Sequence, residues 1–139
     1  MTDDPFALAA SAAAFLRSHF GVDGVDVALV LGSGWSSGAD QLGEPLGEIE
    51  LGEVPGFSKP VVSGHGGALK LVRTAGGKIA AIFTGRTHYY EGRGVEPVVH
   101  GVRTAAAGVA QTLVLTNGCG GLDPAWRRAR SCCSATTST

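Results

Sequence analysis

The 139-residue chain is long enough for one domain, and its 44% hydrophobic content predicts a folded core rather than a disordered segment. Its net charge of −1 gives no general attraction to nucleic acid or to acidic membranes. The three cysteines lack the spacing of a disulfide scaffold or a metal site, so neither is expected. An acidic N-terminus and the absence of a long apolar run predict a cytoplasmic protein with no signal peptide and no membrane span.

The start of the chain is predicted to form a helix followed by a buried strand. Apolar residues recur at helical spacing over Pro5–Phe20, and Gly21 stands where a glycine commonly ends a helix. The continuous apolar run Val25–Gly32 is rich in Val and Leu and is bounded by glycine. Such a run is typical of a strand that is buried on both faces.

The middle of the chain is predicted to hold two or three further strands and a polar loop. The strands are expected around 47–51, 68–74 and 78–84, and Gly76-Gly77 indicates a hairpin turn between the last two. The polar loop is expected over 85–94, directly after the apolar segment KIAAIFT.

The C-terminal part is predicted to repeat the order of helix and strand. Residues 95–109 read as a helix in which Pro97 is tolerated only in the first turn, and Thr112–Gly118 reads as a second buried strand. Strands that alternate with helices indicate an α/β fold with a mixed central sheet flanked by helices. After Trp126 the chain has no Leu, Ile, Val or Phe and shows neither helical nor strand periodicity.

Two glycine loops contain candidate contacts for an anion. Gly32-Ser33-Gly34 follows the first buried strand at its carboxyl end, where glycines expose backbone N–H groups and Ser33 adds a hydroxyl donor. The second loop, 63–67, places His65 between glycines. Each loop taken alone is also consistent with an ordinary surface turn.

The segment Gly85–Gly92, GRTHYYEG, gathers several donors directly after an apolar strand. If the strand continued, Arg86, His88 and Tyr90 would point to one side of it. A guanidinium binds an oxyanion through two parallel hydrogen bonds, an imidazole adds another, and Tyr90 offers a ring and a hydroxyl to a sugar. A solvated strand end is the alternative interpretation, but it does not explain this concentration of donors.

The fourth loop, Thr116–Gly121 or TNGCGG, follows the second predicted strand. Its glycines expose N–H groups that could form an anion nest, although a bare turn is the alternative. We interpret Cys119 as a small packed residue rather than a nucleophile. Since each of the four loops follows a predicted strand or turn, we expect them to surround one oxyanion pocket.

Taken together, the four motifs resemble the trimeric purine nucleoside phosphorylases, which show GSGLG, GHAG, GRxHxYEG and TNAAGG in this order and at similar spacing. The match covers residues 25–126, and GRTHYYEG is its most specific element. The resemblance implies the N-terminal half of an enzyme of purine salvage. Such an enzyme catalyses the reversible phosphorolysis of purine ribonucleosides or deoxyribonucleosides to the free purine and (deoxy)ribose 1-phosphate. It also implies inorganic phosphate as co-substrate, no cofactor, and a homotrimer for the intact protein.

The resemblance further implies a role for each matching residue. Arg86 and His88 are the implied catalytic residues, Tyr90 would lie along the ribose, and Asn117 would shape the loop that holds both ligands. No metal is expected. The implied phosphate contacts are Ser33, His65, Arg86, His88 and the backbone N–H of Gly118.

The sequence departs from the family pattern in three of these loops, and in the second loop Gly66 replaces Ala. Trp35-Ser36 stands where the family has Leu-Gly, so the first loop can take a different path. Gly118-Cys119 replaces the two alanines of the fourth motif, but Gly118 keeps its N–H.

The resemblance implies a second, purine-binding half that supplies a Glu, an Asn and a His. This sequence has no candidates for these residues after Gly121. Permitted codons for residues 129–139, read two bases out of register, yield PVLLLSDHIN, which resembles the family's continuation. We therefore divide the chain into a phosphorylase part, 1–127, and an aberrant tail, 128–139, that is disordered or results from a frameshift. A truncated sheet leaves unpaired edges and an uncovered apolar face, so we expect this chain alone to be poorly soluble or inactive.

Other functions remain open at this point. A related enzyme that acts on 5′-methylthioadenosine is one alternative, and the preference for 6-oxo or 6-amino purines is undecided. A non-catalytic fragment that binds phosphate or a dinucleotide is another. Gly32, Gly34 and Gly38 loosely resemble a dinucleotide fingerprint, but the spacing differs from G-x-G-x-x-G.

Overall fold

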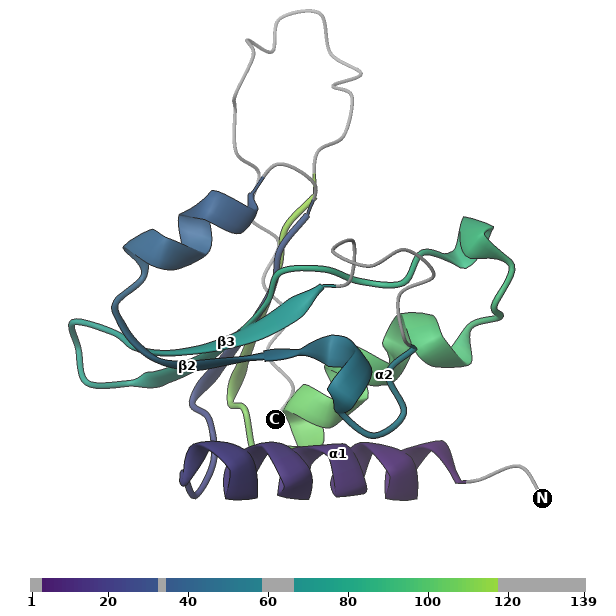
Figure 1. Cartoon of the computed structure of the whole chain (residues 1–139), viewed down its shortest axis with the longest axis horizontal. Coiled ribbons are helices and arrows are strands. Elements are labelled where there is room, and N and C mark those ends of the chain that lie inside the picture. The colour runs from purple at the N-terminus through teal and green to yellow at the C-terminus, as the bar shows by residue number, and fades with distance from the viewer. Residues whose placement is uncertain (1–3, 33–34, 59–66, 118–139) are drawn as a thin grey trace, which may run out of the picture.

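The computed structural model describes residues 4–32, 35–58 and 67–117, which form a five-stranded sheet with flanking helices (Figure 1). The strand order is β2-β3-β4-β1-β5. The elements in chain order are α1 (Pro5–Phe20), β1 (Val27–Val30), the 3₁₀ helix η1 (Ser36–Gln41), β2 (Glu44–Glu50), the 3₁₀ helix η2 (Leu51–Glu53), β3 (Ala68–Arg73), β4 (Ile79–Phe83), the 3₁₀ helix η3 (Tyr89–Glu91), α2 (Glu96–Ala107) and β5 (Thr112–Leu115).

The sheet is mixed, as the sequence predicted. β1 pairs in parallel with both β4 and β5, whereas β3 is antiparallel to β2 and to β4. The carboxyl ends of β1, β4 and β5 therefore lie at the same edge of the sheet. Because β3 runs the other way, its first residue also lies at that end of the strands. We call this end of the sheet the carboxyl edge and the opposite end of the strands the amino edge.

Helix α1 has the predicted bounds because both of its ends are capped. The Asp4 carboxylate accepts a hydrogen bond from the Phe6 N–H, and Gly21 ends the helix in the left-handed conformation at φ 65°. The helix buries a stripe of alanines rather than its phenylalanines, since Phe6 is 68% exposed. The Arg103 guanidinium of α2 lies 5.1 Å from the centre of the Phe6 ring and covers part of it.

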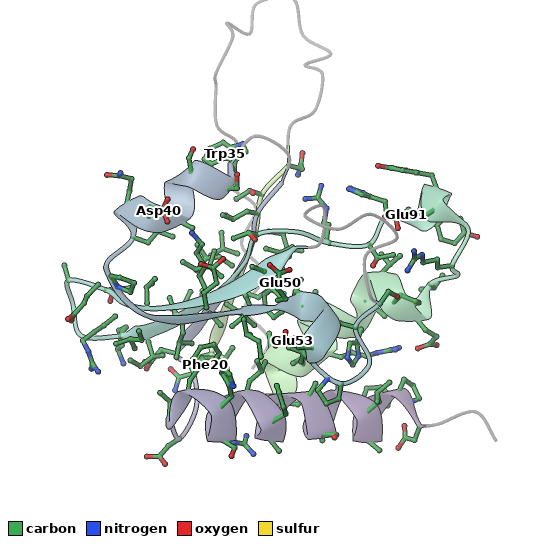
Figure 2. The ribbon with its side chains drawn as sticks, viewed as in Figure 1. Phe20, Trp35, Asp40, Glu50, Glu53 and Glu91 are labelled. Atoms are coloured by element: carbon green, nitrogen blue, oxygen red, sulfur yellow. The ribbon has the colours of Figure 1, made fainter. Side chains whose placement is uncertain are left out.

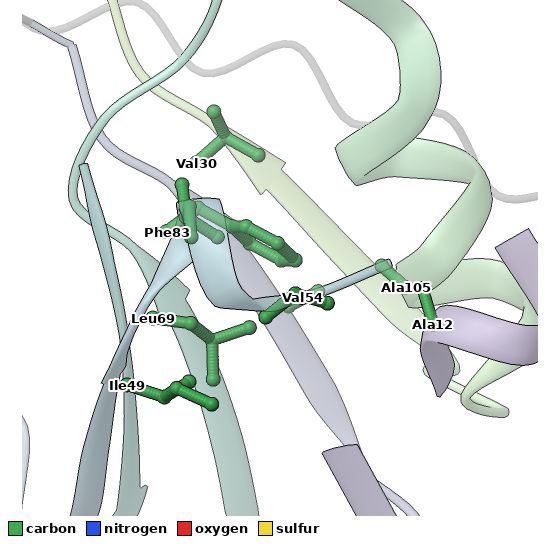
Figure 3. Packing of buried hydrophobic residues seen from close by; sticks show 9 residues of the cluster. Ala12, Val30, Ile49, Val54, Leu69, Phe83 and Ala105 are labelled. Atoms are coloured by element: carbon green, nitrogen blue, oxygen red, sulfur yellow. The ribbon is translucent and has the colours of Figure 1, made fainter. Parts of the chain in front are cut away.

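Both α-helices pack on one face of the sheet and η1 packs on the other. In β1, Ala28 and Val30 belong to the first face, while Val27 and Leu29 contact the cluster on the second, as the two-residue period of a strand requires. Figure 3 shows the first cluster, in which Phe83 lies among residues from α1, α2 and the sheet. Full burial of an aliphatic or aromatic side chain contributes about 1.5–3 kcal/mol, so these residues hold the helices on the sheet.

The predicted hairpin is present between β3 and β4. Gly77 has φ +77°, and its N–H donates to the Thr74 carbonyl at 2.8 Å. β2 is longer than predicted, because its pairing with β3 already begins at Glu44. On the second face, the Lys70 ammonium contacts the Asp40 carboxylate of η1 at 2.8 Å, and this contact raises the pKa of Lys70.

Helix α2 is shorter than predicted and three 3₁₀ helices were not predicted. Proline lies in the first turn of α2, as expected, but the helix ends at Ala107 because Val109 takes a left-handed φ of 61°. The 3₁₀ helices have only three to six residues each, so no apolar period of several turns announces them in the sequence.

The prediction that β5 is a buried strand is wrong. Among the described strands, β5 is the last of the sheet and pairs with β1 alone, and all four of its residues are exposed. Leu113 is 40% exposed and Leu115 is 60% exposed. An apolar strand that is exposed in this way presents backbone groups that can pair with another strand.

The proposed boundary at residue 127 and the tail 128–139 lie outside the described residues. Within the described ranges, no helix combines the length and the apolar character needed to cross a bilayer.

Candidate functional site

Strand direction brings the described parts of all four sequence motifs to the carboxyl edge. Gly32 follows β1, Gly85 follows β4, and Thr116 follows β5. Gly67 directly precedes β3, which runs antiparallel to β4. The carboxyl edge of an open α/β sheet is where such folds commonly bind ligands. The described residues of the four motifs therefore share one edge, while the oxyanion pocket stays a prediction.

Two pairs of backbone segments approach closely at this edge. A Cβ atom built on Gly67 would lie 2.6 Å from the Gly85 Cα, and the reverse distance is also 2.6 Å. A Cβ atom on Gly32 would lie 2.9 Å from the Thr116 carbonyl oxygen and 3.2 Å from the Asn117 Cα. Real Cβ contacts of 2.6 Å do not occur, so the first pair requires glycine on both sides. The glycines thus join the second loop to the third and the first loop to the fourth.

The Arg86 side chain joins the third loop to the first. Its Nη1 donates a hydrogen bond to the Leu31 carbonyl at 2.9 Å. A guanidinium carries five N–H donors, so this bond orients the group and leaves further donors for a ligand. In the described part of the chain no carboxylate pairs with Arg86, whereas Arg93 contacts Glu91 and Arg103 contacts Glu96. The positive charge of Arg86 is therefore not neutralised by a described neighbour.

The expectation that Arg86, His88 and Tyr90 point to one side of a continued strand is wrong. β4 ends at Phe83, and the chain turns into the 3₁₀ helix η3 at Tyr89 because the Glu91 carboxylate accepts a hydrogen bond from the His88 N–H at 2.7 Å. The rings of His88 and Tyr90 instead stack on each other, with centroids 4.9 Å apart and an interplanar angle of 12°.

The exposure of these residues fits contact with a ligand from outside the described chain. His88 is half-buried, while Arg86 is exposed and Tyr90 is 83% exposed. In the view of Figure 2, Trp35 and Glu91 lie in the upper part of the molecule and Phe20 near α1 at the bottom. The stacked pair of rings belongs to the loop that leaves the sheet after β4.

Sequence reasoning missed two threonine hydroxyls that link neighbouring strands at this edge. The Thr84 hydroxyl bonds with both the N–H and the carbonyl of Ala68. The Thr116 hydroxyl accepts a hydrogen bond from the Gly32 N–H at 2.8 Å. No sequence signal marks these hydroxyls, because a threonine at a strand end is common and its partner is distant in the chain.

Three of the predicted phosphate contacts, Ser33, His65 and Gly118, lie outside the described residues, as does Cys119. Asn117 is described and is exposed directly after Thr116, beside the end of β1. The structure therefore places Arg86 and Asn117 at the end of β1, and His88 stacks on Tyr90 further along the third loop. The predicted roles of these residues stay predictions.

The amino edge of the sheet has different electrostatics. The Asp26 carboxylate accepts a hydrogen bond from the Ile79 N–H at 2.8 Å and another from the Lys78 ammonium at 2.9 Å. Both hydrogen bonds lower the pKa of Asp26, and the bond from the Ile79 N–H has the larger effect.

Residues 4–32, 35–58 and 67–117 contain no group of three His, Cys, Asp or Glu side chains that could hold a metal ion.

A small cavity of about 30 Å³ lies in the apolar core rather than at the carboxyl edge. Its lining includes Phe20, Leu69 and the Thr104 hydroxyl, which has no hydrogen-bond partner among the described residues. The space is about that of one water molecule, so it cannot hold a nucleoside.

Comparison with known proteins finds similar enzymes of one name. A purine nucleoside phosphorylase of Cellulomonas sp is 52% identical over 127 residues, which cover 88% of this chain and 45% of the relative. The enzyme of the same name from Mycobacterium leprae (strain TN) is 44% identical, covering 86% of this chain and 44% of the relative. Over most of its length the chain is thus similar to purine nucleoside phosphorylases. No family model matches it.

Solved structures agree with this similarity. Isoform 2 of the purine nucleoside phosphorylase from Schistosoma mansoni, in complex with cytosine and ribose-1-phosphate, superposes with a TM-score of 0.73 at 28% identity. The match covers 85% of this chain and 40% of that structure. The fold is thus that of a nucleoside phosphorylase, and the chain spans less than half the length of the relatives that it matches.

Proposed function

We propose that this chain supplies the phosphate-binding part of a purine nucleoside phosphorylase. The observation that carries the proposal is the convergence at the carboxyl edge, where Arg86 is tied to the end of β1 by the Leu31 carbonyl. Four glycine loops begin or end at this edge, and the described residues leave the charge of Arg86 unpaired. An exposed guanidinium with free N–H donors is suited to an oxyanion such as phosphate.

In the proposed reaction, the bound phosphate attacks C1′ of a purine ribonucleoside or deoxyribonucleoside. The bond from C1′ to the purine nitrogen breaks, its electron pair leaves with the base, and (deoxy)ribose 1-phosphate forms. Positive charge builds on the sugar ring during this step, so an oriented phosphate both stabilises and captures the cation. Arg86 and His88 would hold the phosphate, and the exposed ring of Tyr90 would lie along the ribose.

Residues that hold the purine would come from the part of the phosphorylase fold that this chain does not match. The 40–45% coverage of the relatives supports this division. The intact enzyme would take a purine nucleoside and inorganic phosphate without a cofactor, in purine salvage in the cytoplasm. A homotrimer is the proposed assembly, with no nucleic acid or membrane partner.

The dinucleotide-binding alternative gains no support from the geometry. Dinucleotide sites place a pyrophosphate at the N-terminus of an α-helix that follows the first strand. Here the next described element after β1 is η1, a 3₁₀ helix of six residues. No observation favours 5′-methylthioadenosine over other nucleosides.

A calorimetric titration of the 139-residue chain with inorganic phosphate tests the phosphate site directly. We expect saturable binding with one site per chain and competition by sulfate, which has similar shape and charge. The absence of competing, saturable binding in a folded sample would contradict the proposal.

An assay for the release of free purine from inosine and phosphate separates binding from catalysis. We expect phosphate binding without purine release, because the chain spans less than half the length of its relatives. Purine release by the pure chain would show that the phosphate-binding part alone suffices for the reaction, and would contradict the proposed division.

A further inference from the structure

Three threonine hydroxyls make the same kind of link between neighbouring strands. Each hydroxyl accepts a hydrogen bond from a backbone N–H of the partner strand or its extension and donates one to a backbone carbonyl there. We call this arrangement a threonine clamp; its members are Thr74, Thr84 and Thr116. One hydroxyl has one donor and two acceptor positions, so each clamp uses its donor and one acceptor.

The Thr84 clamp fixes the first residue of β3. Its Oγ1 accepts from the Ala68 N–H at 3.0 Å and donates to the Ala68 carbonyl at 3.0 Å. The Thr84 N–H also donates to the same carbonyl, at 2.9 Å. Both backbone groups of Ala68 are therefore held directly beside Gly67, which in turn contacts Gly85 at the start of the third loop.

The Thr116 clamp fixes the last described residue of the first loop. Its Oγ1 accepts from the Gly32 N–H at 2.8 Å and donates to the Val30 carbonyl at 3.3 Å. The link joins β5 to β1 at their carboxyl ends. The next carbonyl along β1, that of Leu31, is the one that receives Arg86.

The Thr74 clamp has the same geometry at the opposite end of the β3–β4 pair. Its Oγ1 accepts from the Lys78 N–H at 3.1 Å and donates to the Lys78 carbonyl at 3.1 Å. It closes the hairpin turn at the amino edge, away from the four glycine loops. Thr74 and Thr84 are both half-buried, so the chain contains its own control for the Thr84 clamp.

We propose that Thr84 and Thr116 are positioning residues for phosphate binding, an inference that rests on the proposed function. They hold the backbone at the end of β1 and at the start of β3, so that Arg86 is placed for the phosphate. Groups that bind a ligand must lie within about 0.5 Å of their productive positions. A strand end that is held only by its backbone hydrogen bonds opens more readily than one that also has a side-chain hydrogen bond.

The test compares Thr84→Val and Thr116→Val with Thr74→Val in phosphate titrations of the full 139-residue chain. Valine has the shape of threonine but removes both hydrogen bonds and leaves the backbone groups unpaired. We expect the phosphate affinity to fall by about tenfold in Thr84→Val and Thr116→Val, which is the effect of losing roughly one hydrogen bond. In Thr74→Val we expect the phosphate affinity to fall by less than about twofold. Urea unfolding checks that all three lose comparable stability.

Thr84→Ser restores the hydroxyl and should bind phosphate within about twofold of the unchanged chain, since it regains both bonds. Equal phosphate affinity in folded Thr84→Val, Thr116→Val and Thr74→Val would overturn the inference while leaving the proposed function intact. A folded, unchanged chain that does not bind phosphate would overturn the proposed function first. If Thr84→Val does not fold, the comparison of Thr116→Val with Thr74→Val decides the result.

Discussion

Similar hydrogen bonds have different consequences at the carboxyl edge and at the amino edge of the sheet. At the amino edge, the Asp26 carboxylate pairs with Lys78 and the Thr74 hydroxyl closes the turn, so charges and donors are consumed within the chain. At the carboxyl edge, Thr84 ties the strands together in the same way, but Arg86 has no described carboxylate partner. The comparison teaches that the clamps stabilise both edges, while a guanidinium held by the Leu31 carbonyl beside the glycine loops distinguishes the edge that can bind an anion.

The largest expected effect follows from removing this guanidinium. Arg86→Gln should weaken phosphate binding by about a hundredfold, because an Arg–oxyanion contact combines two charge-assisted hydrogen bonds. Arg86→Lys keeps the charge but lacks the forked donors, so we expect a loss of about tenfold. Calorimetric titration with phosphate measures both effects.

Arg73→Gln is the matched control for this comparison. Arg73 ends β3 at the amino edge and is exposed, so the substitution changes the net charge by the same amount far from the glycine loops. We expect phosphate affinity within about twofold of the unchanged chain, since a distant exposed charge is screened by salt. Equal losses in Arg73→Gln and Arg86→Gln would mean that only the net charge matters.

The next effect concerns the close approach of Gly67 and Gly85. Gly67→Ala should lower the free energy of unfolding by about 1–3 kcal/mol, because the new Cβ meets backbone that cannot move aside alone. Gly76→Ala is the control: a Cβ there meets nothing within 4 Å. That variant should be neutral or more stable by about 0.4–1 kcal/mol. Urea denaturation distinguishes the two, and equal stabilities would refute the claimed contact.

The smallest effect is a pH dependence from the amino edge. The hydrogen bond from the Ile79 N–H and the Lys78 ammonium lower the pKa of Asp26 below its ordinary value of 3.8. The ionised carboxylate therefore stabilises the fold above that value, and the contribution is lost as the pH falls through the lowered pKa. Asp26→Asn should be less stable than the unchanged chain at pH 7, and the difference should shrink in acid.

Asp23→Asn supplies the control for this measurement. Asp23 is exposed on the turn after α1 and undergoes the same change of charge. Denaturant unfolding at neutral and acid pH should show little pH-dependent difference for this variant. A constant stability difference between Asp26→Asn and the unchanged chain at every pH would contradict the lowered pKa.

Much of the local structure could be predicted because local residues decide it. Asp4 and Gly21 cap α1 through neighbours within a few residues, and Gly76-Gly77 forms its turn in the same way. The order of the four glycine motifs also indicated the family and the edge where the loops meet. The ends of α1 and the turn depend on contacts between near neighbours in the chain. The glycine motifs can be recognised in the sequence without the rest of the fold.

The sequence by itself determined the strands, the glycine that ends α1 and the residue types available to an anion. Only the tertiary structure decided that β5 is exposed and that the His88 and Tyr90 rings stack instead of following a strand. An apolar run such as Thr112–Leu115 looks the same at the centre and at the edge of a sheet. Its burial depends on which distant segments pair with it or cover it, and that information is not local to the run.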